Sequence, residues 1–154
     1  MDELDESLEL SNAEMHLYSR QILLDGWDTE AQEKLKLANV LIVGCGGIGC
    51  MTAELLARAG VGQITLIDAD TIEVSNLQRQ IAYVENNVGF YKAEVLAQRL
   101  KQINPYIQVH AHAVRLGNLL RDPHASQCPA GGCADGPKTR PHHGPARFRD
   151  HRQA

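Results

Sequence analysis

The stretch NVLIVGCGGIG, residues 39–49, decides the fold. Its apolar run up to Val43 is typical of a buried parallel strand, and the glycines after it mark a turn into a helix. Gly44, Gly46 and Gly49 fit the pattern G-x-G-x-x-G. The first glycine of this pattern permits a tight turn, the second lets the backbone approach a phosphate, and the third allows close packing of helix on strand. The amides at the start of the helix then face an anion.

A second apolar strand, residues 63–67, ends at Asp68, nineteen residues after Gly49. A carboxylate at this place can accept hydrogen bonds from the hydroxyls of a ribose. Strand, glycine turn, helix, strand and acid therefore occur in the order that a nucleotide site requires. We predict an α/β fold, a Rossmann-like βαβ nucleotide-binding domain with a parallel sheet.

The residues beyond Asp68 indicate which nucleotide binds. A dinucleotide pyrophosphate is bound largely by backbone amides, whereas a triphosphate carries more charge and usually recruits Arg, Lys and a divalent metal. Arg79 lies on a polar loop and Lys92 at the start of the next helix, where both can converge on phosphates. We therefore expect a triphosphate, with an NAD-dependent dehydrogenase as a distant alternative. Asp70 either caps the turn before Thr71 or contributes to a metal or nucleotide site.

Two helices are expected before the first strand. Ser11 and Glu14 have the spacing of a capping box that opens a helix through about Leu23, and Asp28 opens a second that ends near Leu37. The helix after the glycine turn is expected to end at Gly60. The side chains expected on its packed face are Ile48, Thr52, Leu55, Leu56 and Ala59.

The next predicted helix covers about residues 90–103, with Val95, Leu96, Leu100 and Ile103 as its apolar stripe. In the strand that follows, Ile107, Val109, Ala111 and Ala113 alternate with polar residues, so His110 and His112 share one face. These two histidines are interpreted as a polar face rather than as metal ligands, because no third ligand is near in the sequence. Cys45 and Cys50 are interpreted as small buried residues.

Length and composition fit a single globular domain. The chain has 154 residues, 44% of them apolar and 22% charged, and a net charge of −4. This charge gives no basic footprint for nucleic acid, and no apolar run approaches the length of a membrane span. The acidic start lacks the basic and apolar parts of a signal peptide, and the four cysteines do not suggest a secreted disulfide scaffold. We expect a cytoplasmic protein.

Several separate motifs, in the same order, resemble one known family. They include the SNAEM run from Ser11, the glycine turn, LIDAD ending at Asp70, SNLQRQ at 75–80, Lys92 and INP at 103–105. The segment 10–116 resembles the HesA/MoeB/ThiF-type, E1-like adenylyltransferases, which activate ubiquitin-like sulfur-carrier proteins in molybdopterin and thiamine biosynthesis. Within this family it looks most like the molybdopterin-synthase adenylyltransferases.

The resemblance implies an activity and a site. The family joins the C-terminal carboxylate of a carrier protein to the α-phosphorus of ATP, with release of pyrophosphate. By resemblance, Gly47 contacts ATP, Asp68 holds the ribose, residues 75–79 and Lys92 bind phosphates, and Arg20 reaches the site from the other subunit of a homodimer. The catalytic residues expected are Arg79, Lys92 and Arg20. The residues expected to bind ATP are Gly44, Gly46, Gly47, Gly49, Asp68, Asp70, Ser75, Asn76, Leu77, Gln78, Arg79 and Lys92.

The ends of the chain differ from the domain between them. Residues 1–9 form an acidic segment, and residues 117–154 have a low-complexity composition in which no element is readable, so we expect an irregular, disordered tail. Cys128 and Cys133 do not have a standard zinc spacing. The magnesium-binding aspartate and the paired zinc cysteines of the family have no match here. We therefore expect a truncated, catalytically impaired domain whose tail arises from a frameshift, or a noncatalytic nucleotide-binding remnant.

Overall fold

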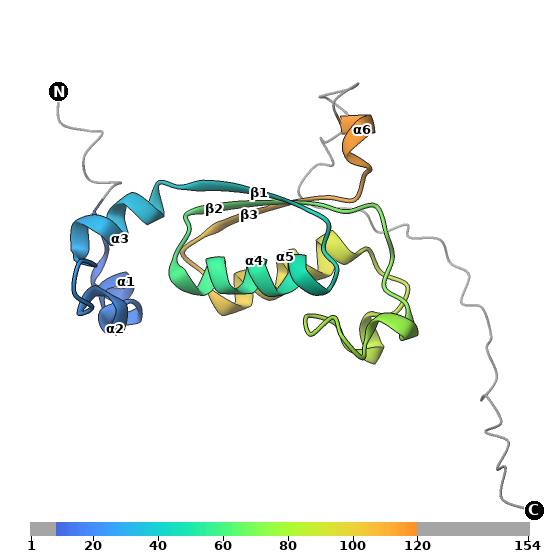
Figure 1. Cartoon of the computed structure of the whole chain (residues 1–154), viewed down its shortest axis with the longest axis horizontal. Helices are drawn as coiled ribbons and strands as arrows, with labels where there is room; N and C mark the ends of the chain where they lie inside the picture. The colour runs from blue at the N-terminus through green and yellow to red at the C-terminus, as the bar shows by residue number, and fades with distance from the viewer. Residues whose placement is uncertain (1–8, 120–154) are drawn as a thin grey trace, which may run out of the picture.

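A computed structural model of the chain describes residues 9–119, which form a three-stranded parallel sheet with helices (Figure 1). The strands are β1 (Asn39–Val43), β2 (Gln63–Ile67) and β3 (Gln108–His112), and they lie in the order β1-β2-β3. The connections between them contain α4 (Gly47–Ala59) and α5 (Lys92–Ile103). The α/β fold and the bounds predicted for the first two strands are confirmed.

Both long helices lie on the same face of the sheet (Figure 1). The reason is topological: each crossover between parallel strands is right-handed, and both crossovers move along the sheet in the same direction. Leu96 and Leu100 of α5 are fully buried, as predicted from the spacing of the apolar stripe. The other face leaves Leu41 and Val43 more than half exposed.

The packed face of α4 differs from the prediction. Cys50, Ala53 and Ala57 are completely buried, whereas Ile48 is 85% and Leu55 61% exposed. Small side chains let the helix lie close to the sheet, and their spacing satisfies the helical period as well as the predicted set does. Leu56 packs against the core as predicted, but the prediction was wrong for Ile48, Thr52 and Leu55, because it ranked candidates by hydrophobicity and not by the space between the layers. The burial predicted for both cysteines is confirmed.

Three short helices precede the sheet: α1 (Asn12–Leu17), α2 (Ser19–Ile22) and α3 (Thr29–Lys36). The capping box of Ser11 and Glu14 and the Asp28 cap of α3 are present as predicted. The first predicted helix is divided at Tyr18 into α1 and α2, so one continuous helix through Leu23 was wrong. The phenol of Tyr18 is held by tertiary contacts, which local sequence does not reveal.

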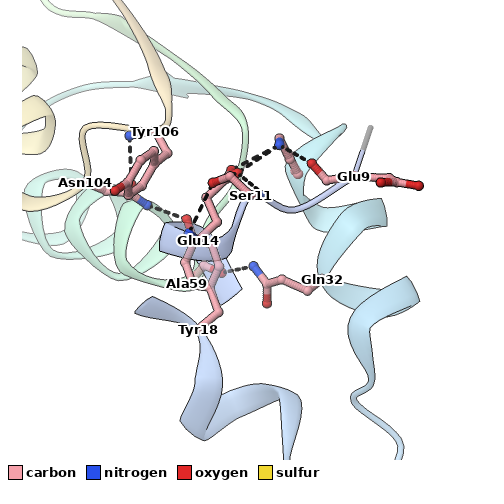
Figure 2. A network of polar contacts seen from close by, with 9 residues as sticks. Glu9, Ser11, Glu14, Tyr18, Gln32, Ala59, Asn104 and Tyr106 are labelled. Atoms are coloured by element: carbon pink, nitrogen blue, oxygen red, sulfur yellow. Dashed lines mark hydrogen bonds and ion pairs between the residues drawn. The ribbon is translucent and has the colours of Figure 1, made fainter. Parts of the chain in front are cut away.

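Those contacts form a polar seam between the N-terminal helices and the carboxyl end of α4. Figure 2 shows its side chains, Tyr18, Gln32 and Asn104, with Ala59. The carbonyl of Ala57 also belongs to the seam. The amide of Asn104 donates to the Tyr18 hydroxyl at 2.7 Å and to the Ala57 carbonyl at 2.8 Å. The amide of Gln32 donates to the Ala59 carbonyl at 2.9 Å. The last carbonyls of a helix have no partner within it, so the seam satisfies groups that burial leaves short of hydrogen bonds.

Glu14 joins α1 to α3. Its carboxylate accepts a hydrogen bond from the Ser11 amide at 2.9 Å and pairs with the Lys36 ammonium at 3.1 Å. Burial acts to raise the pKa of Glu14, but the hydrogen bonds from Ser11 and the Lys36 ammonium outweigh it, so the pKa lies below its usual value. The folded protein therefore favours the charged form of this carboxyl.

The remaining described elements are η1 (Val74–Asn76), η2 (Glu85–Asn87) and α6 (Leu116–Leu119). Because α6 covers residues 117–119, the expectation of no element in the tail was wrong for those three residues. The rest of the tail, with the cysteines weighed as zinc ligands, lies outside the described residues, as does most of the acidic start. Within residues 9–119 no helix is long and apolar enough to cross a membrane.

Candidate nucleotide-binding site

The glycine turn joins the carboxyl end of β1 to α4. Gly44 has φ +94°, a backbone conformation that favours glycine, and its amide donates to the Ile67 carbonyl of β2 at 2.8 Å. A Cβ on Gly49 would lie 1.8 Å from the carbonyl oxygen of Gly44. The first and third glycines thus have the roles predicted for them, a tight turn and close packing of helix on strand.

At Gly46 and Gly47 neither the backbone conformation nor the packing requires glycine. Neither has a positive φ, and a Cβ would have its nearest neighbour at 4.0 Å on Gly46 and 3.7 Å on Gly47, both ordinary contact distances. Gly46 is the N-cap of α4, and no side chain within residues 9–119 caps this helix, so its first amides are open to an acceptor from outside that segment. The protein's own packing explains two of the four glycines, and the other two leave room for a ligand at a positive helix end.

Asp68 follows the last residue of β2 and lies beside the glycine turn. One of its carboxylate oxygens accepts from the Cys45 amide at 2.6 Å and the other from the Asp70 amide at 2.7 Å. Each carboxylate oxygen can accept a second hydrogen bond, so capacity for a ribose hydroxyl remains. Burial, followed by the Asp68 carboxylate, raises the pKa of the Cys45 thiol to about 12. The thiol at the turn is therefore protonated at neutral pH.

Lys92 begins α5, as predicted, and is buried. Its ammonium pairs with the Asp70 carboxylate at 3.2 Å, and its backbone amide donates to the Asp70 carbonyl at 3.0 Å. The Lys92 side chain is 9% exposed against 69% for Asp70. The sequence left Asp70 between a turn cap and a ligand role; in the structure Asp68 caps the turn, and Asp70 holds the lysine.

The loop between Asp70 and Lys92 is closed at its base. Ile72 donates to the Phe90 carbonyl at 2.9 Å and receives a hydrogen bond from the Gly89 amide at 2.9 Å. The carbonyl of Arg79 comes within 3.7 Å of the position a Cβ on Gly47 would take, so the loop returns to the glycine turn. This juxtaposition of two segments distant in sequence creates the candidate site.

Within this loop the predicted phosphate-binding residues have different surroundings. The exposed guanidinium of Arg79 donates to the Ser75 carbonyl at 2.9 Å. Asn76 is buried and its side chain accepts from the Glu73 amide at 3.1 Å, whereas Leu77 packs against the core. The side chains of Ser75 and Gln78 are exposed. The structure thus brings the Arg79 carbonyl close to the glycine turn, with Asn76 and Leu77 anchoring the segment 75–79 on the core.

Two residues escaped the sequence analysis. The buried hydroxyl of Tyr83 donates to the Cys45 carbonyl at 2.7 Å, which fastens the loop to the glycine turn, and burial raises its pKa. Gln80 is 4% exposed, and its Oε1 has no hydrogen-bond partner among the described residues. Gln80 ends the SNLQRQ run, whereas nothing in the sequence distinguishes Tyr83 from an ordinary core tyrosine.

Arg20 is not near these residues. It is exposed on α2, which lies at the opposite end of the sheet from the turn between β1 and α4 (Figure 1). Among residues 9–119 there is also no group of three or more His, Cys, Asp or Glu side chains that could hold a metal ion. The site described here consists of the glycine turn, Asp68, the Asp70–Lys92 pair and the loop that carries Arg79 and Gln80.

A parallel sheet with a glycine turn and an acid at adjacent strand ends defines the class of Rossmann-like nucleotide-binding domains. The sequence pattern of the ThiF family matches residues 18–128, and the chain belongs to this family. Molybdopterin-synthase adenylyltransferase from Salmonella typhimurium is 52% identical over 108 residues, 70% of this chain and 43% of that protein. Sulfur carrier protein adenylyltransferase from Thermus thermophilus is 44% identical over 103 residues, 67% of this chain and 38% of that protein.

A solved structure supports the same fold. The crystal structure of E. coli tRNA N6-threonylcarbamoyladenosine dehydratase in complex with ATP has a TM-score of 0.66 and 37% identity, and covers 72% of this chain and 46% of that one. The chain thus spans less than half the length of these relatives.

Proposed function

We propose that this domain binds ATP at the carboxyl ends of β1 and β2. The observation that carries the proposal is the spare room at Gly46 and Gly47 beside the uncapped amides of α4. Asp68 supplies acceptors for the ribose, and Lys92 and Arg79 supply positive charge for the phosphates. The ATP complex of the E. coli relative supports this assignment.

The proposed reaction is adenylation of the C-terminal carboxylate of a ubiquitin-like sulfur-carrier protein, in keeping with the names of the relatives. A carboxylate oxygen attacks the α-phosphorus of ATP, the bond from that phosphorus to the β-phosphate bridging oxygen breaks, and pyrophosphate leaves with the electron pair. Negative charge increases on the phosphate oxygens, and fixed cations stabilise this change. Arg79 and Lys92 take that role.

Lys92 needs an exchange of partners to do so. In the structure its ammonium is paired with Asp70, which keeps a buried cation compensated. A phosphate oxygen that arrives at the site replaces the exposed Asp70 carboxylate as the partner of the lysine. The pair thus holds the cation in place before the nucleotide binds.

Arg20 is proposed to act in the site of a second copy, since α2 lies at the opposite end of the sheet from its own glycine turn (Figure 1). The proposed assembly is a homodimer. Among residues 9–119 no group of three or more His, Cys, Asp or Glu side chains could hold a metal ion, so these residues by themselves do not fit Mg²⁺.

The chain spans less than half the length of its relatives. We therefore also propose that these 154 residues alone form the adenylate more slowly than the full-length relatives do. A noncatalytic nucleotide-binding domain is the second candidate. Calorimetry with ATP tests binding, and carrier-dependent ATP–pyrophosphate exchange tests adenylation. Absence of ATP binding refutes the proposed function, and exchange at the rate of full-length relatives refutes the proposed impairment.

A further inference from the structure

Gln80 is the buried polar side chain of this site that the reaction described above does not use. Its backbone is fixed on both sides: its amide donates to the Asn76 carbonyl at 3.0 Å, and its carbonyl accepts from the Tyr83 amide at 3.1 Å. Tyr83 in turn is bonded to the Cys45 carbonyl of the glycine turn. The position of Gln80 relative to the glycine turn is therefore set by hydrogen bonds and not by its own side chain.

The side chain points at that turn. Its Nε2 lies 4.0 Å from the position that a Cβ on Gly46 would occupy, and it is the nearest atom to that position. Its Oε1 is buried without a hydrogen-bond partner among the described residues. An unpaired buried carbonyl disfavours the folded state, and an apolar side chain of similar length would avoid this. The carboxamide therefore lowers the stability of the folded state, so stability does not explain its presence here. The group left with a possible role is Nε2, which faces Gly46.

We propose that Gln80 is a further nucleotide-positioning residue, whose Nε2 donates to a phosphate oxygen of ATP beside Gly46. The inference rests on the proposed function. A neutral amide adds no charge to a site that already has Arg79 and Lys92. Because the Gln80 side chain is buried and its backbone is held by hydrogen bonds, however, its amide donates in a fixed direction. The exposed guanidinium of Arg79, which bonds within its own loop, lacks that constraint. Gln80 thereby orients the phosphates that the two cations attract.

The test compares Gln80→Met with the unchanged protein. Met has a similar shape and neither donates nor accepts strongly, so the variant removes the donor and the unpaired carbonyl together. We expect about tenfold weaker ATP binding by calorimetry, the loss typical of a hydrogen bond to a charged group. Without ATP, the variant should unfold at an equal or higher urea concentration. A residue with a merely structural role would not give these opposite changes.

Gln102→Met is the matched control, because Gln102 is exposed near the far end of α5. It should bind ATP as the unchanged protein does. Gln80→Leu provides a second variant, with the same expected loss of affinity. ATP affinity within twofold of the unchanged protein in both Gln80 variants would overturn the inference, as would failure of both to fold. If the unchanged protein binds no ATP, the proposed function itself is refuted. If the unchanged protein binds ATP and both Gln80 variants bind it equally well, only the role of Gln80 is refuted.

Discussion

Gly49→Ala should strongly destabilise the domain. The new Cβ would lie 1.8 Å from the Gly44 carbonyl oxygen and 2.9 Å from its carbon, whereas real Cβ atoms essentially never come within 3.0 Å of another atom. Both partners are backbone, so either the turn or the first turn of α4 has to move. Overpacking of this kind costs about 1–3 kcal/mol, and loss of the hydrogen bond from Gly44 to Ile67 adds about 1 kcal/mol. We expect a total of about 3 kcal/mol.

Urea unfolding followed by circular dichroism measures this difference, with Gly47→Ala as the matched control. Gly47 belongs to the same turn and helix as Gly49, but a Cβ on it would have its nearest neighbour, the Arg79 carbonyl oxygen, at 3.7 Å, an ordinary contact distance. Alanine is also a better helix former than glycine by up to about 1 kcal/mol. The control should therefore be as stable as the unchanged protein or slightly more stable. Unfolding free energies of the two variants within about 0.5 kcal/mol of each other would refute the packing role of Gly49.

Three further outcomes follow from the structure. Asp68→Ala and Arg79→Ala should each weaken ATP binding about tenfold, through lost ribose and phosphate hydrogen bonds, and calorimetry that finds both affinities unchanged would remove these assignments. Because the pKa of Glu14 is lowered in the folded state, its contribution is present above its usual value of 4.5 and is lost as the pH falls through the lower folded value. Glu14→Gln should thus cost about 1 kcal/mol at pH 7 through the weakened Lys36 pair, and flatten the acid limb of a stability–pH curve; an unchanged limb argues against this pair. Cys45, with its thiol pKa raised to about 12, should react with iodoacetamide at pH 8 only after unfolding, and peptide mass spectrometry that finds it labelled in the native protein would contradict its burial.

The sheet could be predicted closely because its signals are local. The apolar runs of residues 39–43 and 63–67 are each bounded by a change in composition, and the structure begins and ends both strands at those residues. The glycine turn was equally readable, since Gly44 and Gly49 meet conformational and steric demands that only glycine satisfies.

The parts that could not be predicted depend on distances between elements. The buried face of α4 is set by how near the helix lies to the sheet, which selects Ala53 and Ala57 over Leu55. Tyr18, where the first helix divides, has its hydroxyl bonded to Asn104, 86 residues away in the chain. Tyr83 likewise gains its role only through a partner 38 residues away. Sequence periodicity carries no information on such pairings.

The polar seam of Figure 2 also fixes how the N-terminal helices are oriented on the sheet. Apolar contacts tolerate sliding, whereas a hydrogen bond weakens steeply when its angle or length changes. The phenol of Tyr18 and the amide of Gln32 therefore allow the N-terminal helices one orientation on the nucleotide domain. Arg20 lies two residues beyond that phenol. In the homodimer proposed above, the backbone that carries its guanidinium would therefore have the same position in both copies.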